Sequence, residues 1–218
     1  MSSSRAVGRF RRFVVGLFLV ALAATGMAQA QDSIRIAIPG EGDTLDPAYM
    51  SFVNSFAVAT NVYSGLVRYK PGTIELMPDL ATSWDISDDG LTYTFHLRTG
   101  VLFQEAPGVT YADREMKADD VEWSLRRYLT EDTAISEHPE YVSAISGSAA
   151  VLAGETEEWA GFEVVDDHTV RMTLDAPNHR FLADLVNAYV VPREALEALG
   201  DGLSNRPVGT GPFLFDRW

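Results

Sequence analysis

Residues 80–98 have the sequence Leu80-Ala-Thr-Ser-Trp-Asp-Ile-Ser-Asp-Asp-Gly-Leu-Thr-Tyr-Thr-Phe-His-Leu-Arg98. In its second half apolar and polar residues alternate, and the apolar ones are Leu91, Tyr93, Phe95 and Leu97. Because successive side chains of a strand point to opposite faces, this pattern predicts a half-buried strand. Asp89-Gly90 is typical of a hairpin turn, since Gly adopts positive φ without strain. We therefore predict a hairpin of strands over 84–86 and 92–97.

Further helices and strands are expected on both sides of this hairpin. Residues 118–129 carry an apolar stripe of helical spacing, with Asp119 and Asp120 in the first turn, where the helix dipole favours negative charge. The same periodicities predict strands over 33–38, 101–103 and 213–215, hairpins over 66–76 and 162–174, and helices over 52–63, 142–152, 180–186 and 193–199. Such a mixture indicates an α/β or α+β architecture.

The first 30 residues have the composition of an export signal. Four arginines and no acidic residue precede an apolar run from Phe13 to Met27, and Ala28-Gln29-Ala30 supplies a small-residue cleavage pattern. We predict a cleavable signal peptide over residues 1–30, with cleavage after Ala30. The alternative, an uncleaved membrane anchor, requires a longer apolar run. Arg11-Arg12 is compatible with twin-arginine export, although paired arginines are also common in ordinary signals.

The composition excludes several classes of site and partner. The chain has no cysteine, so it has no disulfide, no thiolate metal site, no cysteine nucleophile and no lipid attached at the cleavage site. An exported protein without a lipid is expected in a bacterial periplasm. Residues 1–30 hold four arginines and no acid, so the remaining 13 basic and 31 acidic residues give a formal charge of −18. Such a charge repels nucleic acid and anionic lipid, and neither is an expected partner.

The sequence contains no recognisable catalytic, metal or cofactor motif. The four histidines lack the spacing of a helical metal pair, and no serine lies in a nucleophile elbow. Gly209-Thr210-Gly211 is followed by Pro212 and lacks the Lys-Ser/Thr of a phosphate loop, so we interpret it as a tight turn. Neighbouring acids such as Glu157-Glu158 are interpreted as solvated charges. We therefore predict no enzyme, no catalytic residue, no cofactor and no metal site.

Residues 80–103 resemble the extracellular solute-binding protein family 5, the peptide-, nickel- and oligosaccharide-binding proteins of ABC importers. Five further segments resemble motifs of this family, in the same order: Thr44-Leu45-Asp46-Pro47, Val62-Tyr63-Ser64-Gly65-Leu66-Val67-Arg68-Tyr69, Ala118-Asp119-Asp120-Val121, residues 164–170 and residues 207–213. Each motif alone is weak, but six in order are specific, and they cover residues 33–218. Two departures are Lys117, where the family often has a capping Thr, and Ser64, which replaces a frequent Glu.

The resemblance implies a periplasmic-binding-protein-like α/β fold of type II, large cluster, which is a clamshell of two lobes. This chain is expected to be the lobe I portion, and incomplete. Residues 31–70 would form the first part of lobe I, residues 71–189 its second subdomain, and residues 190–218 the return to lobe I, truncated before lobe II. The end of the chain at Trp218, directly after a predicted strand, agrees with this expectation.

The function implied by the resemblance is that of the substrate-binding protein of an ABC transporter. Such a protein captures a peptide or similar small solute in the periplasm and delivers it to a permease in the inner membrane. The full-length protein is expected to be a monomer. We predict Tyr49, Phe52 and Asn54 as ligand-binding residues, because they follow the Leu45-Asp46-Pro47 turn at the carboxyl side of the first strand, where open α/β sheets bind ligands. The alternative is that they only cap the first helix and pack.

Two rival functions are open at this point. A secreted hydrolase using acidic residues would need two carboxylates facing each other across a pocket, and turnover of a peptide or glycoside would identify it. A chemosensory solute receptor on the same scaffold would differ only in its membrane partner. The ligand is also open, because peptides, nickel complexes and sugars share this scaffold.

Overall fold

The computed structural model describes residues 34–106, 108–109, 114–129 and 136–217. The chain divides into two units, Met1–Ala37 and Ile38–Trp218, and every helix and strand named below lies in the second unit. The predicted signal peptide over residues 1–30 lies outside the described residues. Within the described ranges, no helix is long and apolar enough to cross a membrane.

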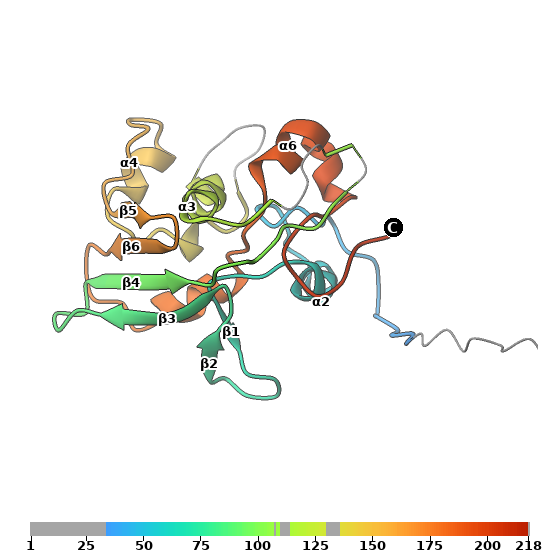
Figure 1. The fold of residues 1–218 in the computed structure, drawn as a ribbon, viewed down its shortest axis with the longest axis horizontal. Helices are drawn as coiled ribbons and strands as arrows, with labels where there is room; N and C mark the ends of the chain where they lie inside the picture. Colours follow the sequence, from blue (N-terminus) through green and yellow to red (C-terminus); the bar gives the residue numbers. More distant parts are fainter. Residues whose placement is uncertain (1–33, 107, 110–113, 130–135, 218) are drawn as a thin grey trace, which may run out of the picture. The chain divides into compact units, whose positions relative to one another are not determined.

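The second unit contains a four-stranded antiparallel sheet (Figure 1). Its strands are β3 (Ala81–Ile86), β4 (Thr92–Leu97), β5 (Phe162–Asp166) and β6 (Thr169–Thr173), in the order β3-β4-β6-β5. β3 and β4 form the predicted hairpin, with Trp84 opposite Phe95 and Gly90 at a positive φ in the turn. β5 and β6 form the hairpin predicted over 162–174.

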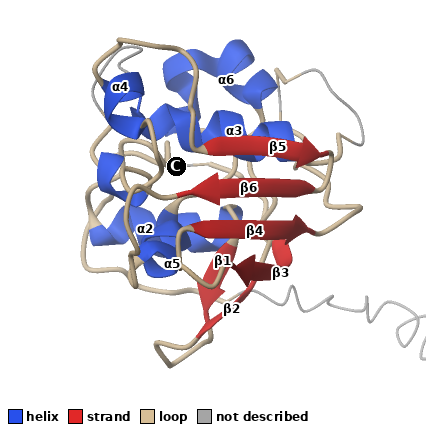
Figure 2. Cartoon of the chain, turned by 90° about the vertical axis from the view of Figure 1, so that its left-hand side faces the viewer, coloured by secondary structure: helices blue, strands red, loops and turns tan. Residues whose placement is uncertain are grey.

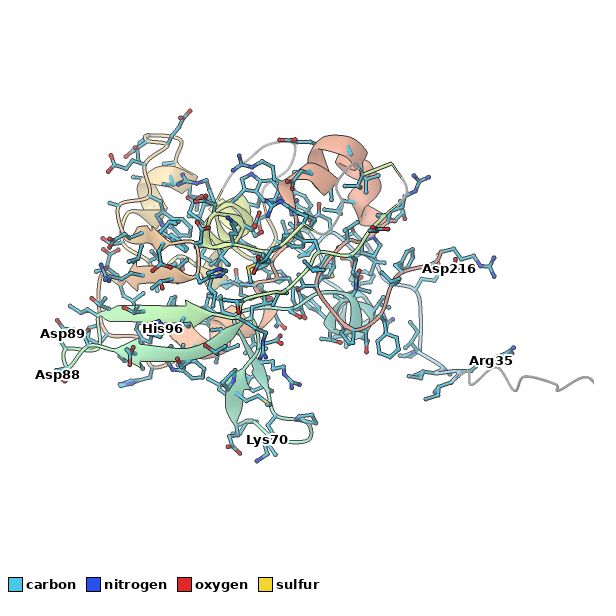
Figure 3. All side chains as sticks on the ribbon, viewed as in Figure 1. Arg35, Lys70, Asp88, Asp89, His96 and Asp216 are labelled. Carbon is cyan, nitrogen blue, oxygen red and sulfur yellow. The ribbon has the colours of Figure 1, made fainter. Side chains whose placement is uncertain are left out.

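One face of this sheet is buried and the other is open. In β4, Tyr93, Phe95 and Leu97 are buried and contribute to the main core, together with side chains from β6 and the helices. Figure 2 shows the helices on one side of the sheet, behind it. His96 lies on the opposite face from Phe95, where its Nε2 is 2.9 Å from the Asp85 carboxylate (Figure 3). The alternation that predicts the strand therefore identifies its core face.

The helices of the described residues are α2 (Val53–Val62), α3 (Ala118–Arg126), α4 (Ser148–Leu152), α5 (Phe181–Asp184) and α6 (Arg193–Leu199). Short 3₁₀ turns cover Arg127–Leu129, Pro139–Tyr141, Leu185–Asn187 and Gly200–Ser204. The predicted helices over 52–63 and 193–199 are confirmed, and those over 118–129 and 180–186 each end as a 3₁₀ turn. The helix predicted over 142–152 is reduced to α4, because Gly147 takes a positive φ directly before it.

A second, two-stranded sheet is formed by β1 (Val67–Tyr69) and β2 (Leu76–Pro78). This is the hairpin predicted over 66–76, but its second strand begins at Leu76 and not at Thr73. The reason is local, because the amide and hydroxyl of Thr73 both donate to the Lys70 carbonyl at 3.0 Å and extend the turn.

Three predicted strands are wrong. Residues 34–38 form no strand and are exposed, and Ser33 lies outside the described residues. Residues 101–103 form only an isolated bridge between Leu102 and Glu115, and residues 213–215 form no strand. Alternation predicts which side chains share a face, whereas a strand also needs the backbone of a neighbouring strand, and no described strand runs beside these segments.

The Gly209-Thr210-Gly211 segment bends, as predicted, against the end of α2. The Gly211 amide donates to the Val62 carbonyl at 2.8 Å, and the side-chain amide of Gln104 donates to the Gly211 carbonyl at 2.8 Å. A Cβ atom on Gly209 would lie 2.4 Å from the Val62 carbonyl oxygen, so a larger residue cannot fit without movement of the backbone. This contact fixes the C-terminal end of α2.

A buried ion pair connects the segment before α2 to the end of α3. Nη2 of Arg127 lies 2.9 and 2.8 Å from the two carboxylate oxygens of Asp46. The side chains of Asp46 and Arg127 are only 5% and 11% exposed. Burial lowers the pKa of Arg127, but the charge of Asp46 and its hydrogen bonds outweigh burial and raise the pKa above its ordinary value. Arg127 is therefore charged at all physiological pH values.

We expect Asp46→Asn to lower the free energy of unfolding of the full-length protein by about 3 to 5 kcal/mol, because it leaves the Arg127 charge buried without an anion. Urea-induced unfolding measures this change. The control is Glu163→Gln, which breaks an ion pair with Arg171 (2.7 Å) on the exposed side of β5 and is expected to cost less than about 1 kcal/mol. Equal losses in the two variants would contradict a structural role for the buried pair.

Candidate functional site

Residues 43–52, named here the Asp46 loop, lie directly before α2 and include Tyr49 and Phe52. Most backbone amides of this loop donate a hydrogen bond. The donors and acceptors are Thr44 to the Asp43 carboxylate, Leu45 to the Ser204 carbonyl, Asp46 to the Thr44 hydroxyl, Ala48 to the Asp46 carboxylate, Tyr49 to the Asp46 carbonyl and Ser51 to the Asp43 carboxylate. A loop with this many satisfied amides has a well-defined backbone conformation.

Carbonyl oxygens of the same loop accept hydrogen bonds from distant parts of the chain. The pairs are Leu45 with the Tyr63 hydroxyl at 2.9 Å, Ala48 with the Ser136 hydroxyl at 2.8 Å and the Glu137 amide at 3.1 Å, and Met50 with Nε2 of His138 at 2.7 Å. The Asp46 loop is therefore fixed from two sides, by the end of α2 and by the segment over 136–138.

The Asp43 carboxylate lies beside the start of α2. It accepts hydrogen bonds from the amide and hydroxyl of Ser51 at 2.8 and 2.7 Å and from the hydroxyl of Ser55 at 2.5 Å. Partial burial raises the pKa of Asp43, but the hydrogen bonds together lower it well below its usual range. Asp43 is therefore an anion at neutral pH, and the dipole of α2 favours this charge at the N-terminal end of the helix.

A small apolar cluster packs under α2 and the Asp46 loop. Its buried members are Met50, Ala59, Val62, Tyr63, Tyr189 and Val191, and the partly buried Phe56, Trp123 and Phe215 pack against them. The rings of Tyr63 and Tyr189 stack at 5.7 Å. Burial raises the pKa of Tyr63 well above its ordinary value, so its hydroxyl is a neutral donor to the loop.

The indole of Trp123, on α3, contacts two arginines. The guanidinium carbons of Arg127 and Arg193 lie 5.7 and 5.4 Å from the ring centroid. Since Arg127 also pairs with Asp46, Trp123 covers the buried ion pair with an aromatic surface. A contact of this kind contributes about 0.5 to 1 kcal/mol at exposed sites and more when it is desolvated.

The structure places the three predicted ligand-binding residues in two environments. Phe52 immediately precedes α2 and is 56% exposed. Asn54 is half-buried in the first turn of α2, where its side-chain amide donates to the Glu41 carbonyl at 3.3 Å. Tyr49 is half-buried and packs against the main core. Phe52 and Asn54 thus lie together at the start of α2, while Tyr49 points into the packing. Their role in ligand binding stays a prediction.

Several residues of this site are not identifiable from the sequence alone. Asp46 belongs to the Leu-Asp-Pro motif, but its partner Arg127 is 81 positions away. The sequence gives one indication that Arg127 forms an ion pair, which is its position among the apolar residues of the stripe over 118–129. A charged side chain that is buried at such a position requires a partner of opposite charge. Neither Trp123 nor His138 lies in a motif that indicates its contact with the loop.

The residues of the Asp46 loop and the start of α2 have the properties of a binding surface. Among the side chains that the structure describes, no group of three or more His, Cys, Asp or Glu could hold a metal ion. The start of α2 presents an exposed aromatic ring next to a rigid, hydrogen-bonded backbone. Rigid polar groups beside an apolar contact are typical of small-molecule recognition.

Comparison with known sequences gives the relationships of the chain. Residues 75–218 match the family described as "Bacterial extracellular solute-binding proteins, family 5 Middle". The protein named di/tripeptide-binding protein 4 of Pseudomonas aeruginosa is 38% identical over 209 residues, which cover 91% of this chain and 38% of that protein. The dipeptide-binding protein of Escherichia coli is 32% identical over 214 residues, 94% of this chain and 38% of that protein. The chain thus spans little more than a third of these relatives.

The fold of the chain is also similar to the folds of solved binding-protein structures. The periplasmic binding protein DppA of Helicobacter pylori, in complex with the peptide STSA, superposes with a TM-score of 0.68 at 36% identity, over 82% of this chain and 35% of that chain. OppA of Haemophilus influenzae, in complex with RPPGFSPFR, gives a TM-score of 0.71 at 24% identity, over 80% of this chain and 34% of that chain. The predicted type II periplasmic-binding-protein fold, present in part, is confirmed. The chain belongs to family 5 of the bacterial extracellular solute-binding proteins.

Proposed function

We propose that this chain is part of the substrate-binding protein of an ABC importer, which captures a small peptide in the periplasm and delivers it to a permease in the inner membrane. The observation that supports this most strongly is the 38% identity, over 91% of the chain, to a protein named for di- and tripeptides. The resemblance of the fold to a binding protein crystallised with a peptide agrees with it. In this function the protein binds its ligand without converting it.

The favoured ligand class is di- and tripeptides. Relatives that the chain matches over nine tenths of its length are named for dipeptides, for di- and tripeptides, or for glutathione, which is itself a tripeptide. Heme-binding protein A of Haemophilus influenzae is 39% identical, but the match covers only 73% of this chain. Nothing in these comparisons supports the hydrolase or the chemosensory receptor as an alternative.

The proposed location and partners follow from the sequence of the first 30 residues and from the family. A cleaved signal peptide would release the protein into the periplasm, and without cysteine it would carry no lipid. We propose that it acts there as a monomer. The proposed division into residues 31–70, 71–189 and 190–218 would place the Asp46–Arg127 pair between the first two parts of lobe I.

The proposed mechanism uses the Asp46 loop as a preformed half of the ligand site. Because its backbone is already hydrogen-bonded, the loop loses little conformational entropy when a ligand binds. Phe52 would provide an apolar contact for a ligand side chain, and Asn54 an amide for a polar group. The rest of the site would come from the second lobe of the full-length protein, and closure follows because the ligand binds the closed state more tightly.

The proposed function predicts that the full-length protein binds dialanine and trialanine in a saturable, one-to-one complex without hydrolysing them. Isothermal titration calorimetry measures binding, and mass spectrometry of the recovered peptide detects cleavage. Turnover of either peptide would favour a hydrolase. Absence of binding to both, with the protein folded by circular dichroism, would contradict a peptide-binding role.

The proposed ligand contacts predict that replacing Tyr49, Phe52 and Asn54 together by alanine weakens dialanine binding by roughly tenfold, or about 1.4 kcal/mol, because a few residues of a binding surface carry most of its free energy of binding. The control is Ile74→Ala, at a side chain that is 92% exposed in the β1–β2 hairpin. Unchanged affinity in the triple variant would show that these residues only cap α2 and pack.

A further inference from the structure

The guanidinium of Arg193, at the start of α6, is held over the indole of Trp123 on α3. Its carbon lies 5.4 Å from the ring centroid. The backbone sets this position, because the hydroxyl of Ser124 accepts from the Val191 amide and donates to the Val191 carbonyl, each at 3.0 Å. The start of α6, two residues later, is thereby fixed beside α3. The ring contact orders a long side chain that is otherwise flexible.

Arg193 has no anion of its own within the described part of the chain. Its side chain is exposed, and no ion pair joins it to a described carboxylate, including that of Glu197 one helical turn further on. The other acidic side chains of α3, α6 and the Asp46 loop that form ion pairs do so with different arginines. These pairs are Asp120 and Glu194 with Arg114, Glu122 with Arg126, and Asp46 with Arg127. The positive charge of Arg193 is therefore open to a ligand.

The indole of Trp123 also has an unused hydrogen-bond donor. Its Nε1–H has no acceptor among the described residues, and this nitrogen is not buried, so solvent reaches it. An indole offers this one donor and no acceptor, and a guanidinium offers five donors and no acceptor. Together the two side chains present N–H groups and a positive charge, which are the groups that recognise a carboxylate.

This pair of side chains is connected to the proposed ligand contacts by the apolar cluster under α2. Trp123 packs against that cluster, which contains Met50 of the Asp46 loop. Phe56 packs against the same cluster and lies one turn after Phe52 on α2. The cation and the proposed apolar contact thus border one packed unit.

We propose that Arg193, ordered by Trp123, is a specificity-determining residue of the ligand site that binds a carboxylate side chain of the peptide, so that peptides containing glutamate are preferred. This inference rests on the proposed function. The overall charge acts in the opposite direction, because the 13 basic and 31 acidic residues after residue 30 repel an acidic peptide. A preference for such a peptide therefore requires a local cation, and the charge of Arg127 is already paired with Asp46.

The test compares the affinities of the full-length protein for Ala-Glu and Ala-Gln, and for Glu-Ala and Gln-Ala, by calorimetry at about pH 7. Each pair of peptides differs in charge and hardly in shape. In at least one pair we expect the acidic peptide to bind roughly fivefold more tightly, which corresponds to the upper end of exposed ion pairs. Arg193→Gln should remove this preference, and Arg193→Lys, which keeps the charge, should retain part of it.

The matched control is Arg180→Gln, which changes the net charge by the same amount at a side chain that is 84% exposed directly before α5. This variant should keep the full preference. An equal loss in Arg180→Gln and Arg193→Gln would show that the preference follows net charge, and would overturn the role of Arg193.

A second readout detects the contact itself. In the full-length protein labelled with ¹⁵N-tryptophan, the indole resonance that is missing from Trp123→Phe should shift more with the preferred acidic peptide than with its amide counterpart. Equal shifts, no preference in the unmodified protein, or a preference that survives Arg193→Gln would overturn the role of Arg193 and leave the proposed function intact. Failure of dialanine and of all four peptides to bind would overturn the proposed function itself.

Discussion

Burial of the Asp46–Arg127 ion pair is the constraint on which the arrangement of this structure depends. Burying two charges is costly unless they form an ion pair with good geometry. The segment before α2 is therefore held where the Asp46 carboxylate contacts Arg127 at the end of α3. From that position, Asp46 also accepts the Ala48 amide through its side chain and the Tyr49 amide through its carbonyl. One residue thus links long-range packing to the local geometry of the loop.

This constraint gives the candidate site its properties. Most backbone amides of the Asp46 loop are hydrogen-bonded within the protein, so the exposed aromatic side chain of Phe52 follows a segment of defined conformation. Rigidity on one side suits a two-lobed binding protein, in which the free energy of binding is used for closure of the other lobe. In the proposed function, contacts to the charged ends of a peptide would belong to the part of the full-length protein that closes over this surface.

The sequence predicts those parts of the fold whose pattern is local. The alternation from Leu91 to Leu97 and the Asp89-Gly90 turn are enough for the β3–β4 hairpin, because neighbouring side chains and one glycine determine it. The same alternation fails over 34–38 and 213–215, where no strand of the described residues runs beside the segment.

The site is less predictable than the fold because its contacts connect residues that are far apart in the sequence. Arg127 reaches Asp46 across 81 positions, and His138 reaches Met50 across 88. The resemblance to the family identifies Asp46 within a motif, but no local pattern indicates which cation it meets. Likewise, nothing around His138 in the sequence indicates that its ring contacts the Met50 carbonyl.

Amide hydrogen exchange over residues 45–51 in the ligand-free full-length protein measures whether the Asp46 loop is fixed before the ligand binds. We expect slow exchange at Leu45, Ala48 and Tyr49, comparable to that of strand β4. Exchange of these amides at the rate of an unstructured chain, while β4 stays protected, would contradict it.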